Sequence, residues 1–233
     1  MPDSQIFCFT YAGGNASFFD TIAKDLPGFS VIGLEYAGHG ERRKEPFYAD
    51  FNELADDLFQ SIKVSRTNSK YALFGYSMGT ISLIEILKRI KTDGMKLPDH
   101  VFLAAHEPLT REELVNFTDD ALDDCIKERT IRFGSVPEKL IGNRSFWRVY
   151  LPLYRRDYSM IARYQFEPPT IRFDVPATVF YSENDAPYEK IKQWSLYFKH
   201  CSYHQYDGNH FFIQSHHKEM ADVIREKMNE VKE

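Results

Sequence analysis

The stretch that decides the fold class is Tyr71-Ala72-Leu73-Phe74-Gly75-Tyr76-Ser77-Met78-Gly79. It begins as a short apolar run, which is typical of a strand buried in a parallel sheet. The run enters a Gly-x-Ser-x-Gly pattern at Gly75, and an aliphatic helical pattern follows from Thr80 to Ile90. A serine placed between a strand and a helix in this pattern predicts a sharp, strained turn that exposes Ser77 as a nucleophile.

Strand and helix patterns alternate on both sides of this turn. Apolar and β-branched runs predict strands at Ile6 to Tyr11, Ser30 to Leu34, Tyr71 to Gly75, Val101 to Ala105, Thr178 to Tyr181 and Tyr203 to Tyr206. Amphipathic spacing predicts helices from Asp50 to Lys63, where Asp50 and Glu53 resemble a capping box, and from Met220 to Met228. The alternation predicts a mostly parallel sheet flanked by helices, and together with the serine turn it predicts the α/β-hydrolase fold.

One long segment breaks the alternation. From about residue 107 to residue 166 the strand signals stop, helical patterns take over, and aromatic residues are frequent. We expect a helical lid over the catalytic end of the sheet, inserted into a single domain that spans residues 1–233. The alternative is that these helices only fill out the core.

Composition excludes several classes of function. A net charge of -5 argues against nucleic acid as a partner, because such binding depends on an excess of Lys and Arg. The three cysteines, Cys8, Cys125 and Cys201, are scattered without the spacing of a zinc site, so we expect no metal and no other cofactor. No run of about eighteen apolar residues occurs, which argues against a membrane partner. We therefore expect a soluble cytoplasmic protein that is a monomer.

A serine nucleophile needs a histidine base and an acid that orients it. Of the eight histidines, His210 alone follows the last strand in a turn-forming sequence, Asp207-Gly208-Asn209-His210, and keeps the chain order Ser, Asp, His. Asp185 lies on a short loop after the strand from Thr178 to Tyr181, where its carboxylate can reach the far nitrogen of His210. Glu183 and Asp207 remain alternative acids.

The reaction also needs an oxyanion hole made of two backbone N–H groups. One belongs to Met78, the residue after the nucleophile. The other comes from the loop after the first strand, Tyr11-Ala12-Gly13-Gly14-Asn15, in which Ala12 is the candidate donor and the glycines let the backbone approach a substrate. The alternative is an ordinary glycine turn.

Several stretches together resemble the type II thioesterases that accompany non-ribosomal peptide and polyketide synthases. These stretches are Phe9-Thr10-Tyr11-Ala12-Gly13-Gly14, Tyr36-Ala37-Gly38-His39-Gly40-Glu41-Arg42, Gly75-Tyr76-Ser77-Met78-Gly79, Leu151-Pro152-Leu153-Tyr154-Arg155-Arg156-Asp157-Tyr158 and Gly208-Asn209-His210-Phe211-Phe212. The resemblance spans nearly the whole chain. It departs at Tyr76, where the family commonly has histidine.

The resemblance implies an editing enzyme that hydrolyses acyl thioesters from the phosphopantetheine arm of an acyl or peptidyl carrier protein. The implied chemistry uses a Ser-Asp-His triad and an acyl-enzyme, and the implied partner is the carrier domain of a synthase. Arg144, Arg148, Arg155 and Arg156 are candidates for docking an acidic carrier, or else they pair with aspartates of the lid. The alternatives are a free-standing carboxylesterase or acyl-CoA thioesterase, and a non-catalytic binding protein of the same fold.

Overall fold

Six strands form one sheet in the order β2-β1-β3-β4-β5-β6, and each neighbouring pair runs parallel. A computed structural model describes residues 4–67, 70–108, 119–134, 136 and 138–230. The strands are β1 (Ser4–Phe9), β2 (Phe29–Gly33), β3 (Tyr71–Tyr76), β4 (His100–Ala104), β5 (Ala177–Tyr181) and β6 (Cys201–Gln205). All six predicted strands are present within two residues of their expected bounds, and the predicted fold class is confirmed.

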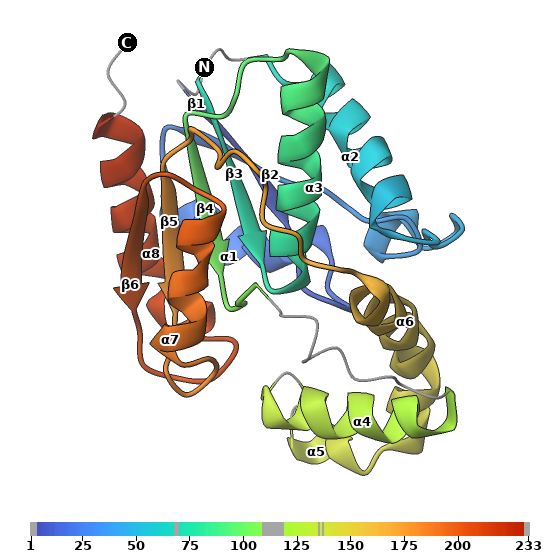
Figure 1. Cartoon of the computed structure of the whole chain (residues 1–233). Coiled ribbons are helices and arrows are strands. Elements are labelled where there is room, and N and C mark those ends of the chain that lie inside the picture. Colours follow the sequence, from blue (N-terminus) through green and yellow to red (C-terminus); the bar gives the residue numbers. More distant parts are fainter. Residues whose placement is uncertain (1–3, 68–69, 109–118, 135, 137, 231–233) are drawn as a thin grey trace.

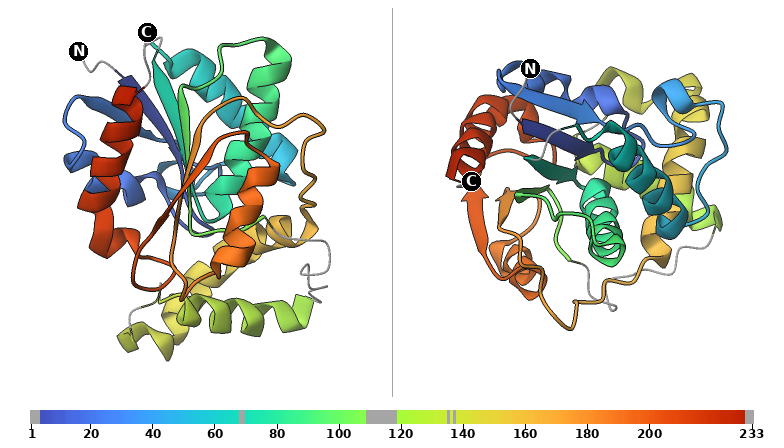
Figure 2. Two further views of the ribbon diagram at one scale, coloured as in Figure 1. Left: turned by 60° about the vertical axis from the view of Figure 1, so that its left-hand side comes forward. Right: turned by 90° about the horizontal axis from the view of Figure 1, so that it is seen from above.

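Helices cover both faces of the sheet, as Figures 1 and 2 show. One face carries α2 (Phe51–Ser65), α3 (Met78–Asp93), α7 (Tyr188–Ile191) and the 3₁₀ helix η4 (Lys192–Leu196). The other carries the 3₁₀ helix η1 (Ala16–Phe19), α1 (Asp20–Lys24) and α8 (Ile213–Glu230). The remaining short 3₁₀ helix of the sheet region is η2 (Gly40–Arg42).

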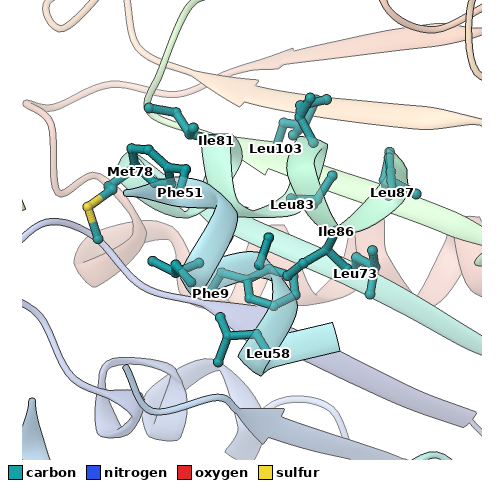
Figure 3. Packing of buried hydrophobic residues seen from close by; sticks show 14 of the residues in the cluster. Phe9, Phe51, Leu58, Leu73, Met78, Ile81, Leu83, Ile86, Leu87 and Leu103 are labelled. Carbon is teal, nitrogen blue, oxygen red and sulfur yellow. The ribbon is translucent and has the colours of Figure 1, made fainter. Parts of the chain in front are cut away.

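The apolar strands supply side chains to both layers, because successive residues of a strand point to opposite faces. In β3, Leu73 packs toward α2 and α3, whereas Ala72 and Phe74 pack toward α1 and α8. Figure 3 shows how Phe9 and Leu73 meet α2 and α3 in the larger layer. The Met78 side chain is fully buried in that layer, which anchors the first turn of α3 directly after the serine.

The start of α2 differs slightly from the predicted capping box. Asp50 accepts hydrogen bonds from the Asn52 and Glu53 N–H groups at 2.8 and 3.0 Å, as an N-cap aspartate should. The Glu53 carboxylate, however, accepts from the Ala49 N–H at 2.8 Å and not from the N-cap residue itself. The N-terminus of α2 is still capped, because Asp50 accepts from N–H groups inside the helix and Glu53 accepts from the N–H of the residue before Asp50.

Three helices lie across the carboxyl ends of the strands, in the region predicted to form a lid (Figure 1). They are α4 (Asp119–Arg132), α5 (Glu138–Ile141) and α6 (Arg144–Arg163). Helix α6 also packs into the larger core layer through Trp147, Leu151 and Met160. The first part of the predicted insertion, residues 109–118, lies outside the described residues. Among the helices that the structure describes, none is both long and apolar enough to cross a membrane.

Candidate active site

The turn that carries Ser77 is strained, and the flanking glycines are what make it possible. Ser77 has φ 53° and ψ -119°, a backbone conformation that non-glycine residues rarely adopt. A Cβ on Gly75 would lie 2.4 Å from the Gly79 carbonyl oxygen, and a Cβ on Gly79 would lie 2.0 Å from the Phe9 carbonyl oxygen. The two glycines therefore let helix α3 start against strands β1 and β3, with Ser77 at the tip of the turn.

His210 joins Ser77 to Asp185. Its Nε2 lies 2.9 Å from Ser77 Oγ, and its Nδ1 lies 2.8 and 2.9 Å from the two Asp185 carboxylate oxygens. Because an ionised carboxylate can only accept, Nδ1 carries a proton, and in the neutral ring Nε2 is then free to accept the Ser77 proton. The His210 and Asp185 side chains are only 5% and 6% exposed, so water competes weakly for these contacts.

The alternative acids are placed differently. The Glu183 side chain is exposed and accepts from the Tyr188 N–H at 3.2 Å, and Asp207 is exposed on the turn before His210. Other histidines have partners elsewhere: His100 bonds to Thr178 over 2.9 Å, and His217 bonds to Asp25 over 2.5 Å. The described geometry thus brings together Ser77, Asp185 and His210 among the predicted residues.

Two contacts that sequence reasoning missed, one buried and one partly buried, support the His210 loop. The Tyr76 hydroxyl donates to the His210 carbonyl oxygen over 2.6 Å, and the Ser182 hydroxyl donates to the Gly208 carbonyl oxygen over 2.6 Å. The second contact ties the loop that carries Asp185 to the loop that carries His210. The departure from the family pattern at Tyr76 was the available signal for the first contact, but its partner depends on the three-dimensional fold.

The oxyanion loop forms a tight turn beside the serine. The Gly14 N–H donates to the Tyr11 carbonyl oxygen over 2.9 Å, and Gly13 has φ 77°, as the third residue of a type II turn requires. Ala12 lines the same cavity as Ser77 and His210. Within the described part of the chain, neither its N–H nor that of Met78 at the start of α3 donates to a protein acceptor.

The lid helices cover the site at the carboxyl ends of the strands. Phe133, just after α4, stacks on the His210 ring with centroids 4.0 Å apart and planes 14° apart. Arg129 of α4 and Tyr158 of α6 line the same cavity, whose volume is about 80 Å³. The Arg129 guanidinium lies 5.2 Å from the Phe133 ring and 5.7 Å from the Tyr158 ring. Helices α4 and α6 therefore supply one wall of the cavity.

His106 lines the same cavity and stays neutral. Burial lowers its pKa to about 3, with smaller effects from Arg129 and His210. In the parts of the chain described by the structure, no three His, Cys, Asp or Glu side chains gather as a metal site would require. Of the lid arginines singled out for docking, Arg155 pairs with Asp123 through two hydrogen bonds of 2.8 and 2.7 Å.

A parallel sheet with a serine at a strand-to-helix turn, a histidine after the last strand and a covering lid defines a hydrolase of the α/β-hydrolase fold. Residues 4–228 match the thioesterase domain family, and this match covers almost the whole chain. The chain belongs to this family and is a thioester hydrolase of the serine-nucleophile class. The resemblance to type II thioesterases is confirmed.

Individual relatives agree with this assignment. A probable cadicidin biosynthesis thioesterase from Streptomyces griseus is 30% identical over 218 residues, which are 91% of this chain and 59% of that protein. The chain thus spans less than two thirds of that relative's length. The solved structure of the type II thioesterase BorB from the borrelidin biosynthetic cluster is 25% identical, with a TM-score of 0.80 and coverage of 97% of this chain and 92% of BorB. ClbQ from the colibactin pathway shares the fold, with a TM-score of 0.86, 20% identity and coverage of 98% of both chains.

Proposed function

We propose that this chain is an editing thioesterase that removes acyl groups from the phosphopantetheine arm of carrier domains in a peptide or polyketide synthase. The observation that carries the chemistry is the line of hydrogen bonds from Asp185 through His210 to Ser77. The carrier and the pathway are proposed from the relatives, whose names include a probable cadicidin biosynthesis thioesterase and a type II thioesterase from the borrelidin biosynthetic cluster.

In the proposed reaction, the Ser77 oxygen attacks the thioester carbonyl carbon while His210 Nε2 takes the serine proton. Asp185 holds the imidazolium that forms. The negative oxygen of the tetrahedral intermediate accepts from the Ala12 and Met78 N–H groups. The intermediate collapses, the C–S bond breaks, and His210 returns the proton to the departing thiolate. Water then attacks the acyl-serine by the same route, which releases the acid and restores Ser77.

The size of the cavity bears on how a substrate enters. Its volume of about 80 Å³ is smaller than the roughly 300 Å³ at which ordinary ligand pockets begin. An acyl group with its pantetheine arm does not fit beneath Phe133 in this arrangement. We therefore propose that α4 moves away from His210 to admit the arm, and that closure afterwards excludes water from the first step.

The test compares kcat/KM for one acyl group delivered on CoA, on N-acetylcysteamine and on a holo carrier protein. We expect the carrier to be the best donor, and we expect Ser77→Ala to lower hydrolysis of all three by about 10³-fold or more. Equal rates on CoA and on the carrier would contradict the carrier assignment and favour an acyl-CoA thioesterase. Near wild-type turnover by folded Ser77→Ala would contradict the mechanism itself.

A further inference from the structure

Two of the family-like stretches, around His39 and around Asp157, contribute nothing to the hydrogen bonds of Ser77. The fold nevertheless brings them together at the edge of the site. His39 Nε2 lies 2.9 Å from Asp157 Oδ2, and the two side chains are only 2% and 1% exposed. The same Asp157 oxygen accepts the Gly13 N–H over 2.6 Å. Asp157 belongs to lid helix α6, and Gly13 follows Ala12 in the oxyanion turn.

The hydrogen bonds decide the charge of this pair. His39 Nδ1 lies 3.1 Å from the Ala37 carbonyl oxygen, which can only accept, so Nδ1 must carry a proton. Nε2 faces the Asp157 carboxylate oxygen and must also donate. His39 is therefore an imidazolium. Burial opposes the charge, but Asp157, the Ala37 carbonyl and the nearby Glu35 outweigh it and raise the pKa of His39 above its ordinary value.

Aromatic rings pack against His39, and Tyr48 and Arg156 line the same small cavity as the pair. The rings of Tyr36 and Phe47 stand edge-on to His39, with centroids 5.7 and 5.8 Å away. The Glu35 carboxylate accepts the Ala16 N–H, at the start of η1, over 3.1 Å. A buried charge without a partner is costly, so His39 fixes Asp157 in place and Asp157 fixes His39.

Helix α6 holds the oxyanion turn at a second point, one turn of helix before Asp157. The Tyr154 ring lies over Gly13 so closely that a Cβ there would be 2.2 Å from a ring carbon. Tyr154 and Asp157 are three residues apart and so share one face of the helix. Tyr154 thus covers the Cα of Gly13, and Asp157 accepts the Gly13 N–H. Together these two contacts favour the orientation that the Ala12–Gly13 peptide has in a type II turn.

We propose that the His39–Asp157 ion pair is a positioning device that fastens lid helix α6 to the oxyanion turn, so that the Ala12 N–H is correctly placed only while α6 is docked. The inference rests on the proposed role of Ala12. It extends that role, because it makes the stabilisation of the intermediate depend on a side chain of the lid. His39 and Asp157 are positioning residues that do not touch the substrate.

The decisive variant is Asp157→Asn, which keeps the shape of the side chain. One oxygen of Asp157 accepts from both His39 and Gly13, whereas a carboxamide places either its oxygen or its NH₂ group there. The NH₂ group cannot accept the Gly13 N–H, and the neutral oxygen no longer balances the charge of His39. The matched control is Tyr164→Phe, which removes the 2.7 Å bond from the Tyr164 hydroxyl to Glu85 and loosens the same helix away from the oxyanion turn.

The assay is hydrolysis of a p-nitrophenyl ester, which needs the serine and the oxyanion donors but no carrier. We expect Asp157→Asn to lower kcat about 10- to 100-fold with KM nearly unchanged, a smaller loss than removing an oxyanion donor outright. Tyr164→Phe should leave kcat nearly unchanged. Amide hydrogen exchange at Gly13 should become faster in Asp157→Asn and stay as in the wild type in the control.

Three results would overturn the proposal: an unchanged kcat in folded Asp157→Asn, a rise in KM alone, or an equal loss of kcat in Tyr164→Phe. If Asp157→Asn does not fold, His39→Gln breaks the pair from the other side and is judged by the same two measurements. A wild-type protein that hydrolyses the ester but no thioester would contradict the proposed function. The comparison of variants on the ester would still decide whether the pair positions the turn.

Discussion

Replacing Tyr76 by phenylalanine removes one hydroxyl from behind the active site and leaves the apolar packing in place. That hydroxyl donates to the His210 carbonyl oxygen over 2.6 Å, and the Tyr76 side chain is fully buried. Burial raises the pKa of Tyr76 well above its ordinary value, so the hydroxyl remains a donor at any working pH. The ring itself stacks against Phe211 with planes 19° apart, a contact that phenylalanine would keep.

The loss leaves the His210 carbonyl buried without this donor, which costs about 1–3 kcal/mol. For a chain of this size the melting temperature should fall by roughly 2–4 °C for each kcal/mol. The carbonyl belongs to His210, the proposed catalytic base. When the His210 backbone is held less firmly, its Nε2 is also held less firmly beside Ser77. The Ser182 contact to Gly208 still holds the loop, and we therefore expect kcat to fall about tenfold, less than the 10²-fold of a 1 Å displacement.

Tyr71→Phe is a matched control from the same strand. The Tyr71 hydroxyl donates to the Lys96 carbonyl oxygen over 2.5 Å, and its side chain is also fully buried. It lies five positions before Tyr76 on β3, about 16 Å away along the strand. Thermal unfolding should show a smaller loss of stability in Tyr71→Phe, because Lys96 is exposed and water can replace the hydroxyl at its carbonyl. Steady-state turnover should fall only in Tyr76→Phe. Equal effects on kcat, or none in Tyr76→Phe, would refute the reasoning.

Three further changes test other parts of the site. Asp185→Asn should lower kcat by up to about 10⁴-fold because the histidine loses its fixed tautomer, and Glu183→Gln should retain most activity; a larger loss in the second variant would reverse the assignment of the acid. Gly79→Ala places a Cβ 2.0 Å from the rigid Phe9 carbonyl, so urea unfolding should show a loss of about 1–3 kcal/mol or more, and wild-type stability would contradict this close approach. Because the pKa of His106 is lowered to about 3, the unfolded chain takes up a proton below pH about 6.5 that the folded chain excludes. Wild-type stability should therefore fall more steeply between pH 6.5 and 4 than that of His106→Asn, by up to about 1.4 kcal/mol per pH unit, and parallel slopes would argue against a neutral buried His106.

The sequence was sufficient for features set by local patterns. The strand run before Ser77 and the glycines around it allow few structures other than a tight strand-to-helix turn. His210 could be selected because it is the histidine that follows the last strand in a turn-forming sequence. These predictions needed only the order of elements and the rule that parallel strands end at one edge of the sheet.

Other features depend on which distant segments meet, and no periodicity encodes that. The contact of Asp157 with His39 joins residues 118 positions apart, and although both lie in family-like stretches, neither stretch indicates that the two side chains meet. The short helix α1 was not predicted because its five residues carry too little amphipathic signal. The choice of Asp185 over Glu183 and Asp207 was left open by the sequence for a related reason, since a displacement of a few ångströms in a loop decides which carboxylate meets the histidine.

The covering of one face of the sheet by α1 and α8 has a consequence for how the chain matures on the ribosome. The strand residues beneath these helices, such as Ile6 and Phe74, are synthesised long before α8, which closes over them and bonds to Asp25 through His217 and Arg225. Until then an apolar layer faces solvent, a state in which nascent chains engage chaperones or aggregate. His210 emerges only just before α8 (Ile213–Glu230), so a nascent chain gains its proposed catalytic histidine and the helix that covers this apolar layer almost together.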